Sequence, residues 1–281
     1  MRTMLYPAFG HEFITVSGES RPGLPPDEAA RDLFARFSTE LQAHGLSLDD
    51  TVRTRLWGRD RAARDGGSGA RVQVLSGKAR SASSSYISPR HFDSAGAVAV
   101  DLWAMRGAFQ KTVQEYDPPI VPPRYIVTGG LVFLSGVTWD TGTLDEQLDA
   151  ILPRIDGSLQ NAGASWAHVV KLSCFLHRSQ TVQALRTGLQ RVLGAERGTL
   201  LSWAAPVEVT YSFVDGYSTP GKLIEIETTA VLYRAGVPGD LAPSHNMCHY
   251  GAMTKSDHAG LAHRLPSGAT VSAQGAQRPS P

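Results

Sequence analysis

Two acidic residues, Glu225 and Glu227, lie two positions apart in the apolar run Lys222–Tyr233. Successive side chains of a β-strand point to opposite faces, so residues two apart share one face. Neighbouring carboxylates disfavour each other's ionisation, and a carboxyl group with a raised pKa is suited to general acid–base chemistry. Simple exposure of this face to solvent is the alternative.

A third carboxylate and a thiol lie inside other apolar runs. Asp101 interrupts the run Ala97–Met105. Burial of an unpaired carboxylate is costly, so we expect a cationic partner or a pocket beside Asp101. Cys174 lies in the run Val169–Leu176. We expect this cysteine to be a small buried hydrophobic residue rather than a nucleophile.

Side chains that can bind metals gather near the C-terminus. They are His245, Cys248, His249, His258 and His263. Their spacing matches no closed structural zinc site, and neither cysteine of the chain belongs to a CxxC pair. The sequence also lacks the GxGxxG, Walker, HExxH and GxSxG motifs. These patterns give no support to a metal site, a nucleotide-binding loop or an α/β-hydrolase, and we expect a disordered arm or a flap over a pocket at this end.

The elements that must position these residues occur twice, at an offset of 118 residues. Val16-Ser17-Gly18 aligns with Leu134-Ser135-Gly136. In each half, apolar residues at helical spacing follow, over Ala30–Leu41 and over Leu148–Leu159. Both helical stripes are predicted to face a core. Pro153 lies inside the second stripe and is expected to kink that helix or delay its start.

Short apolar runs predict strands on both sides of each helix. In chain order they are Phe13–Val16, Val52–Trp57, Ala97–Met105, Leu131–Leu134, Val169–Leu176 and Lys222–Tyr233. Before the last strand the offset between the halves grows by about six residues. A second helix is predicted over Val182–Val192 in the second half, whereas Arg61–Arg71 is rich in glycine and predicts an eroded helix or a loop.

These patterns divide the chain into four regions of an α+β protein. The first domain spans residues 1–112, and the second domain spans residues 125–235. A linker rich in proline, residues 113–124, joins them, because its prolines cannot belong to a central strand or a helix interior. Residues 236–281 have no sustained apolar period and predict an irregular or disordered tail.

The repeated motifs resemble those of the Rid/YjgF family of reactive-intermediate deaminases. The second half carries the resemblance through Val132–Gly136, Ala164–Lys171 and Gly221–Glu227. The first half resembles the family more faintly, through Val16–Gly18 and Ala79-Arg80-Ser81. The resemblance implies two fused Rid/YjgF-like (chorismate-mutase-like) domains, each a curved, mostly antiparallel sheet backed by helices, followed by the tail.

The resemblance also implies a chemistry. Members of the family hydrolyse imines and enamines, typically 2-imino acids, without a metal or organic cofactor. An arginine in an A-R-S motif binds the substrate carboxylate through its planar guanidinium, and a carboxylate in a V-E-I-E strand activates the attacking water. The pockets lie between neighbouring subunits of a trimer. We therefore expect a small-molecule substrate and a homo-oligomer, with a trimer of two-domain chains favoured.

The residues that match these catalytic roles are divided between the halves. In the first half Arg80 matches the arginine, and Asp101 matches the first glutamate of the strand motif. In the second half Glu225 keeps the carboxylate, but Ala204 stands where the arginine belongs. Arg80 and Asp101 are the best pair within one half. A composite pocket that joins Arg80 to Glu225 is the alternative.

Five further residues are candidates for substrate binding: Ser83, Tyr86, Ser135, Glu208 and Tyr211. The first two follow Arg80, where alternate residues would share its face, although a serine run is also ordinary for an edge or loop. Ser135 belongs to the Ser-Gly motif. The last two would line a pocket with Glu225 if the chain is similar to chorismatases, which have two Rid-like halves and keep their site in the second.

The overall composition excludes several partners and locations. The chain has 281 residues with 27 Lys and Arg against 26 Asp and Glu, a net charge of +1, so no basic surface for nucleic acid is expected. No run reaches the roughly 18 apolar residues that span a membrane. Two cysteines cannot form a disulfide framework, and we expect a cytoplasmic protein.

Three functional hypotheses are consistent with the sequence. The first is a cofactor-independent enzyme that hydrolyses a small carboxylated imine or enamine, specialised for secondary metabolism. The second is a chorismatase-like enzyme that cleaves an enol ether. The third is a non-catalytic protein that binds a metabolite or acts as a scaffold, which the missing arginine at Ala204 favours.

Overall fold

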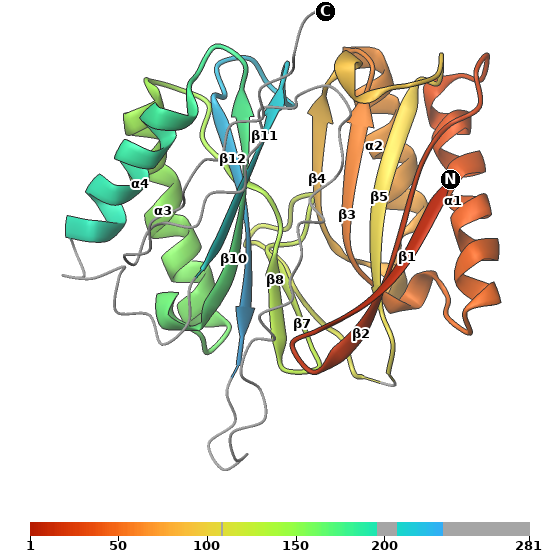
Figure 1. The fold of residues 1–281 in the computed structure, drawn as a ribbon, viewed down its shortest axis with the longest axis horizontal. Coiled ribbons are helices and arrows are strands. Elements are labelled where there is room, and N and C mark those ends of the chain that lie inside the picture. The colour runs from red at the N-terminus through yellow and green to blue at the C-terminus, as the bar shows by residue number, and fades with distance from the viewer. Residues whose placement is uncertain (108, 196–206, 233–281) are drawn as a thin grey trace, which may run out of the picture.

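The computed structural model describes residues 1–107, 109–195 and 207–232. They form two β-sheets that face each other, and each sheet carries two helices on its outer side (Figure 1). Each sheet and its helices come from one half of the chain. The α+β fold and the two fused domains are therefore confirmed.

The first domain contains a five-stranded sheet in the order β1-β2-β5-β3-β4. Its elements are β1 (Arg2–Ala8), β2 (His11–Glu19), α1 (Pro26–Ala43), β3 (Thr51–Gly58), α2 (Arg61–Val74), β4 (Ala82–Ile87) and β5 (Val98–Met105). Neighbouring strands are antiparallel except β3 and β4, which are parallel. The strand β4 is thus an edge strand whose outer backbone groups need partners.

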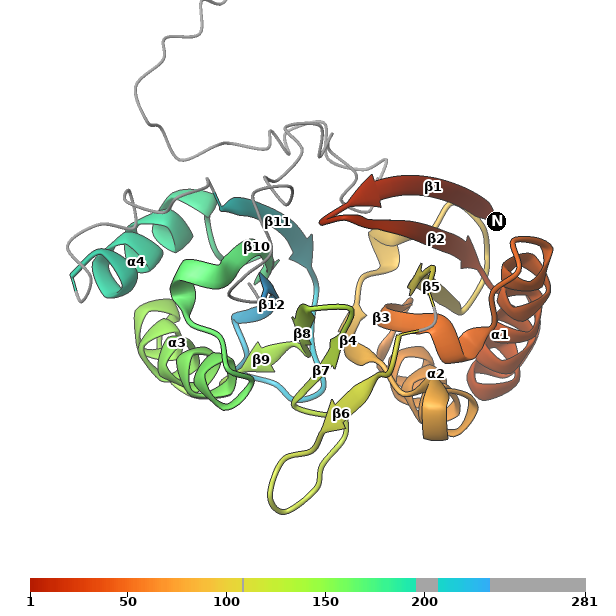
Figure 2. The same ribbon diagram turned by 90° about the horizontal axis from the view of Figure 1, so that it is seen from below.

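The second domain repeats this arrangement in a sheet ordered β11-β10-β12-β8-β7-β6. Its elements are β6 (Thr112–Gln114), β7 (Tyr125–Thr128), β8 (Leu131–Leu134), β9 (Val137–Thr138), α3 (Leu144–Asn161), β10 (Val169–His177), α4 (Val182–Ala195), β11 (Glu208–Val214) and β12 (Ile224–Val231). The strand β9 pairs with β12. Because β6 pairs with β7, the proline-rich residues 115–124 connect two strands of this second sheet (Figure 2).

Helices α1 and α3 occupy equivalent positions and bury the predicted stripes. The stripe of α1 from Ala30 to Leu41 is fully buried. Helix α3 begins at Leu144, where Thr143 and Glu146 form a capping box, so Pro153 does not delay its start. The capping box gives hydrogen-bond partners to the first N–H groups of the helix, so the helix starts well before Pro153. No helix among the described residues is long and apolar enough to cross a membrane.

Helix α2 corrects the prediction of an eroded helix or loop over Arg61–Arg71. The side chain of Asp60 accepts a hydrogen bond from the amide of Ala63 and caps the helix. Gly67 faces the sheet, and a Cβ there would lie 3.0 Å from Val98 and 3.2 Å from Leu56. The glycine content that weakens an isolated helix therefore allows α2 to pack closely on β3 and β5.

The strand register also corrects the alignment of the two halves. Arg55 of β3 pairs with Asp101, and the equivalent Ser173 of β10 pairs with Glu227. Asp101 is therefore equivalent to Glu227, and Ala99 occupies the position of Glu225. The offset at the last strand is 126, which is eight more than 118 rather than six. The sequence match of Asp101 to the first glutamate was two residues out of register.

The domains meet through apolar side chains and through the edge of β4. Phe13 and Phe133 pack edge to face across the junction, and Tyr86 stacks on Phe175 at 4.2 Å between ring centroids. At the edge of β4, the amide of Ser83 donates to Ser135 Oγ, and Ser83 accepts from the amide of Gly136. The second domain thus supplies the partners that this edge strand lacks.

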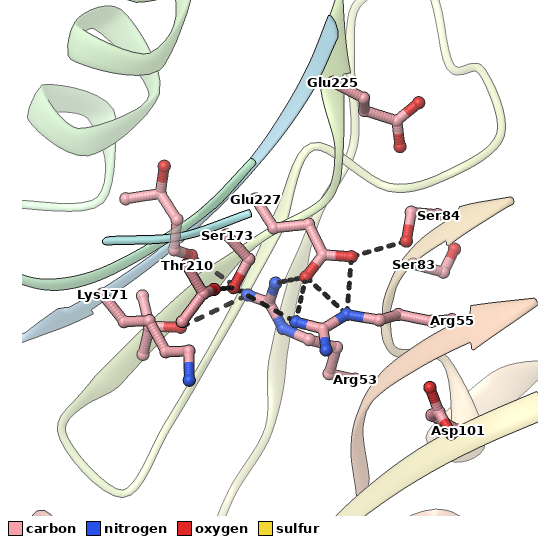
Figure 3. A network of polar contacts seen from close by, with 12 residues as sticks. Arg53, Arg55, Ser83, Ser84, Asp101, Lys171, Ser173, Thr210, Glu225 and Glu227 are labelled. Carbon is pink, nitrogen blue, oxygen red and sulfur yellow. Dashed lines mark hydrogen bonds and ion pairs between the residues drawn. The ribbon is translucent and has the colours of Figure 1, made fainter. Parts of the chain in front are cut away.

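A buried ion cluster connects the facing sheets. Glu227 is 1% exposed and accepts hydrogen bonds from Arg53 and Arg55 of the first domain, with Arg55 Nη2 at 2.7 Å (Figure 3). Ser84 Oγ donates to its other oxygen at 2.5 Å. Arg55 also donates to Ser173 Oγ at 3.2 Å. Both carboxylate oxygens are therefore bonded to the other domain.

Replacement of Glu227 by glutamine is expected to destabilise the protein strongly. The substitution leaves two buried guanidinium groups without their counter-charge, which costs about 3–5 kcal/mol of unfolding free energy. Urea unfolding at pH 7 measures the loss. The control is Asp149→Asn, which removes the exposed Asp149–Arg191 pair and is expected to change the unfolding free energy little. Equal small effects of both substitutions would contradict the importance of the buried cluster.

Candidate active site

Glu225 lies on β12 at the domain junction, two residues before Glu227. Its side chain is buried, and the hydroxyl of Tyr86 donates a hydrogen bond to Oε1 at 3.2 Å from the other domain. The carboxyl group rests against the backbone of Gly136, where any Cβ would collide with it. The glycine of the repeated Ser-Gly pair therefore makes room for a carboxylate.

The two neighbouring carboxyl groups have opposite pKa shifts. Burial, and then the negative charge of Glu227, raise the pKa of Glu225 to about 7, against the lowering effect of Lys222. Burial alone would raise the pKa of Glu227 too, but Arg55 and Arg53 lower it to about 2. Glu227 is thus ionised at neutral pH, whereas Glu225 can exchange a proton near neutral pH.

Arg80 lies two residues before the start of β4 at Ala82 and lines a pocket beside this strand. Its guanidinium pairs with both carboxylate oxygens of Glu115, a residue that directly follows β6. About a third of each side chain is exposed. Ser83 and Arg71 line the same pocket, and so does Pro123 from the segment that follows Glu115. The pocket is therefore walled by both domains.

Ser83 connects this pocket to Glu225. It lines the pocket that contains Arg80, while its backbone bonds to Ser135 Oγ at 3.1 Å and to the amide of Gly136 at 3.3 Å. Gly136 is the residue on which Glu225 rests. Figure 3 shows Glu225 on the strand of Glu227, on the side of Ser83 and Ser84. Arg80 and Glu225, from different halves, therefore both lie beside β4: Arg80 precedes its first residue, and Glu225 is bonded by Tyr86 near its last.

Arg80 and Asp101, the pair expected within the first half, have different partners in the structure. Asp101 accepts a hydrogen bond from the indole N–H of Trp57 at 3.1 Å. The strand β3 lies between β4, which follows Arg80, and β5, which carries Asp101. The carboxylate that Arg80 binds is Glu115.

The second-half residues Glu208 and Tyr211 are not gathered around Glu225. Glu208 pairs with Lys171 at 3.2 Å. Tyr211 packs against the core between the second sheet and its helices, where Arg186 lies over its ring. Glu225 instead faces Tyr86 of the first domain. Glu208, Tyr211 and Glu225 therefore do not form a pocket within the second half.

Sequence analysis missed the basic residues of the junction. Arg53 and Arg55 lie two apart on β3, and each is at most 4% exposed. Glu225 and Glu227 have the same spacing on β12, and both arginines bond to Glu227. This matching spacing is the feature of the sequence that could have identified the arginines. Arg71 lies in the segment predicted to be loop or eroded helix, so its burial was not foreseeable from local pattern.

The remaining candidates concern the thiol and metal binding. Cys174 is buried, and burial raises the pKa of its thiol to about 12, which confirms a small hydrophobic role. The His and Cys residues of the tail, and Ala204, lie outside the described residues. Within the described part of the chain no three His, Cys, Asp or Glu side chains are placed to hold a metal ion.

Glu225→Gln is expected to change stability in a pH-dependent way. The carboxyl group has an ordinary pKa of 4.5 and a pKa of about 7 when buried. Its contribution to stability is therefore complete below pH 4.5 and is lost as the pH rises through 7. Relative to wild type, the glutamine variant should gain about 1–3 kcal/mol in unfolding free energy between pH 4 and pH 8.

Thermal or urea unfolding at the two pH values measures this gain. The matched control is Glu28→Gln, at an exposed position on α1. The difference in unfolding free energy between Glu28→Gln and wild type should be the same at both pH values. A pH-independent difference for Glu225→Gln would contradict a carboxyl group that titrates near neutrality.

Comparison with known proteins follows the division into halves. Residues 121–232 match the sequence model of the family described as Endoribonuclease L-PSP. The sequence matches none of the curated proteins with which it was compared. The family match covers the second domain, including Ser135, Gly136 and Glu225.

Solved structures show similarity to one domain or to both. A chorismatase is 17% identical, with a TM-score of 0.55, over 80% of this chain and 75% of its own. A member of the YjgF protein family from Neisseria meningitidis is 24% identical over 45% of this chain and 98% of its own, with a TM-score of 0.36. A protein of the conserved Rid family from Yersinia pestis is 21% identical over 44% and 100%, with a TM-score of 0.37. The chorismatase shares the two-domain fold.

Proposed function

We propose that this chain, a two-domain member of the Rid/YjgF superfamily, is a cofactor-independent enzyme that hydrolyses a small carboxylated imine or enamine at its domain junction. The observation that carries the proposal is the environment of Glu225. A buried carboxyl group with a pKa of about 7 lies where the two halves meet, bonded by Tyr86 and seated on Gly136. A general base works best when its pKa lies near the operating pH.

In the proposed reaction Glu225 moves one proton twice. Its carboxylate takes a proton from water while the water oxygen bonds to the imine carbon and the π electrons pass to the protonated nitrogen. The carboxylic acid then returns the proton to nitrogen, and the C–N bond breaks as a lone pair of the hydroxyl oxygen forms the C=O bond. The departing ammonia takes up the hydroxyl proton, so the products are ammonium and a 2-oxo acid. The hydroxyl of Tyr86 orients the carboxylate through both steps.

Arg80 is proposed to bind the substrate carboxylate. Its guanidinium already holds a carboxylate in a two-pronged arrangement, that of Glu115. This pair is partly exposed, so a substrate can replace Glu115 at modest cost. Ser83 and Ser135, which bond to each other at the junction, are proposed to position the substrate between Arg80 and Glu225. The site is then shared by both halves, and each chain has one.

The activity is tested by ammonia release from freshly generated 2-imino acids, with spontaneous hydrolysis subtracted. Wild type should accelerate release, and Glu225→Gln should lower kcat/KM about 100- to 10,000-fold, because it removes the general base. Arg80→Ala should chiefly raise KM. Wild-type kcat/KM should rise with pH through about 7, as Glu225 loses its proton.

Glu28→Gln serves as the control for glutamate replacement on the surface and should retain wild-type rates. Retention of wild-type activity by Glu225→Gln would refute the proposed base. Binding of the products without any turnover would favour the metabolite-binding alternative.

A chorismatase-like reaction is the second candidate. The similarity that favours it is the two-domain fold shared with a chorismatase over 80% of this chain. Absence of acceleration by wild type on any 2-imino acid, with release of pyruvate from chorismate, would establish this alternative. The trimeric assembly and the cytoplasmic location stay predictions from the sequence.

A further inference from the structure

Arg71 is a buried cation at the wall of the Arg80 pocket. It lies on the third turn of α2 and is 4% exposed. Its guanidinium donates to the carbonyl oxygen of Ser84 at 2.5 Å and to Ser85 Oγ at 2.8 Å. These bonds hold the group in one place beside β4, so it is a preorganised feature of the pocket.

The charge of Arg71 is not balanced by an ion pair. No carboxylate of the described residues lies within ion-pair distance of it, whereas Arg53, Arg55 and Arg80 each have one. Burial, and then the charge of Arg64, lower the pKa of Arg71 to about 10, which still leaves it protonated at neutral pH. A buried charge without a partner is unfavourable, and an anionic ligand group would relieve that cost.

The other walls of the pocket fit a short acidic molecule. Hydroxyl groups of Thr54, Ser81 and Ser83 line it and can donate hydrogen bonds to carboxylate oxygens. The apolar side chains of Leu75 and Val121 line the remainder and fit a short carbon chain. No acidic side chain belongs to the described lining. Two guanidinium groups therefore face one small space.

We propose that this pocket takes a diacid, with one carboxylate bound by Arg80 and a second acidic group bound by Arg71. The inference rests on the proposed function for the identity of the reacting group, since the diacid would be a 2-imino dicarboxylate. Arg71 is then the residue that sets specificity for two negative charges. Glu115 occupies the site of one of these charges until the substrate displaces it.

Binding of 2-oxo acids tests the proposal without any turnover, because these acids are the expected products. The probes are 2-oxoglutarate and 2-oxoadipate, compared with the monoacids of equal chain length, 2-oxopentanoate and 2-oxohexanoate, by isothermal titration calorimetry. Wild type should bind at least one diacid about tenfold or more tightly than its monoacid, the effect of one additional charge-assisted contact.

Two substitutions at Arg71 assign the preference to this residue. Arg71→Gln should remove the preference for the diacid and change monoacid binding less than about threefold, whereas Arg71→Lys should keep most of it. The control is Arg31→Gln, which removes a surface guanidinium bonded to Asp27 on α1 and should bind as wild type does. If Arg71→Gln does not fold, the binding of diacids and monoacids by wild type and by Arg71→Lys still tests the proposal.

Equal binding of diacids and monoacids by wild type would overturn the proposal, and so would a preference that survives in Arg71→Gln. Absence of binding by all four acids would overturn it as well. Failure of the proposed function is distinguishable from these results. A diacid preference that depends on Arg71, without ammonia release from any 2-imino acid, would keep the diacid pocket and refute the hydrolytic reaction.

Discussion

The ionised carboxylate of Glu227, held between Arg53 and Arg55, is the interaction on which the junction depends. It joins β3 of the first sheet to β12 of the second. The bonds form only when the two sheets are aligned so that Glu227 faces both arginines. Burial is the main cause of the raised pKa of Glu225, the neighbouring carboxyl group on the same face, and the charge of Glu227, which the arginines keep ionised, raises this pKa further. The structural ion pair thus adds to the pKa shift of the carboxyl group beside it.

In the proposed site the two halves contribute different groups. The register makes Asp101 the counterpart of Glu227, and Ala99 the counterpart of Glu225, so the first domain has no carboxyl group at the position of Glu225. The first domain instead contributes Arg80, which precedes β4, and Tyr86 of β4, an edge strand that bonds to Ser135 and Gly136 of the second domain. The proposed site therefore depends on the contact between the halves.

Local sequence pattern predicted the repeat, the helices α1 and α3, and most strands, because buried apolar positions recur with the period of each element. It failed at α2, where Gly67 packs against Val98 and Leu56 in a contact that only tertiary structure reveals. It misaligned Asp101 because a shift of two residues leaves a strand side chain on the same face. The pairing of Arg80 with Glu115 and the burial of Arg71 depend on packing between distant segments.

The proposed site is built from both halves beside β4. A crystal structure of the protein with a bound 2-oxo acid is the sharpest test of this arrangement. We expect the ligand carboxylate to lie on Arg80, with Glu115 displaced, and the ligand carbonyl carbon to face Glu225 beside Gly136. A ligand enclosed by residues of a single domain, away from both Arg80 and Glu225, would contradict it.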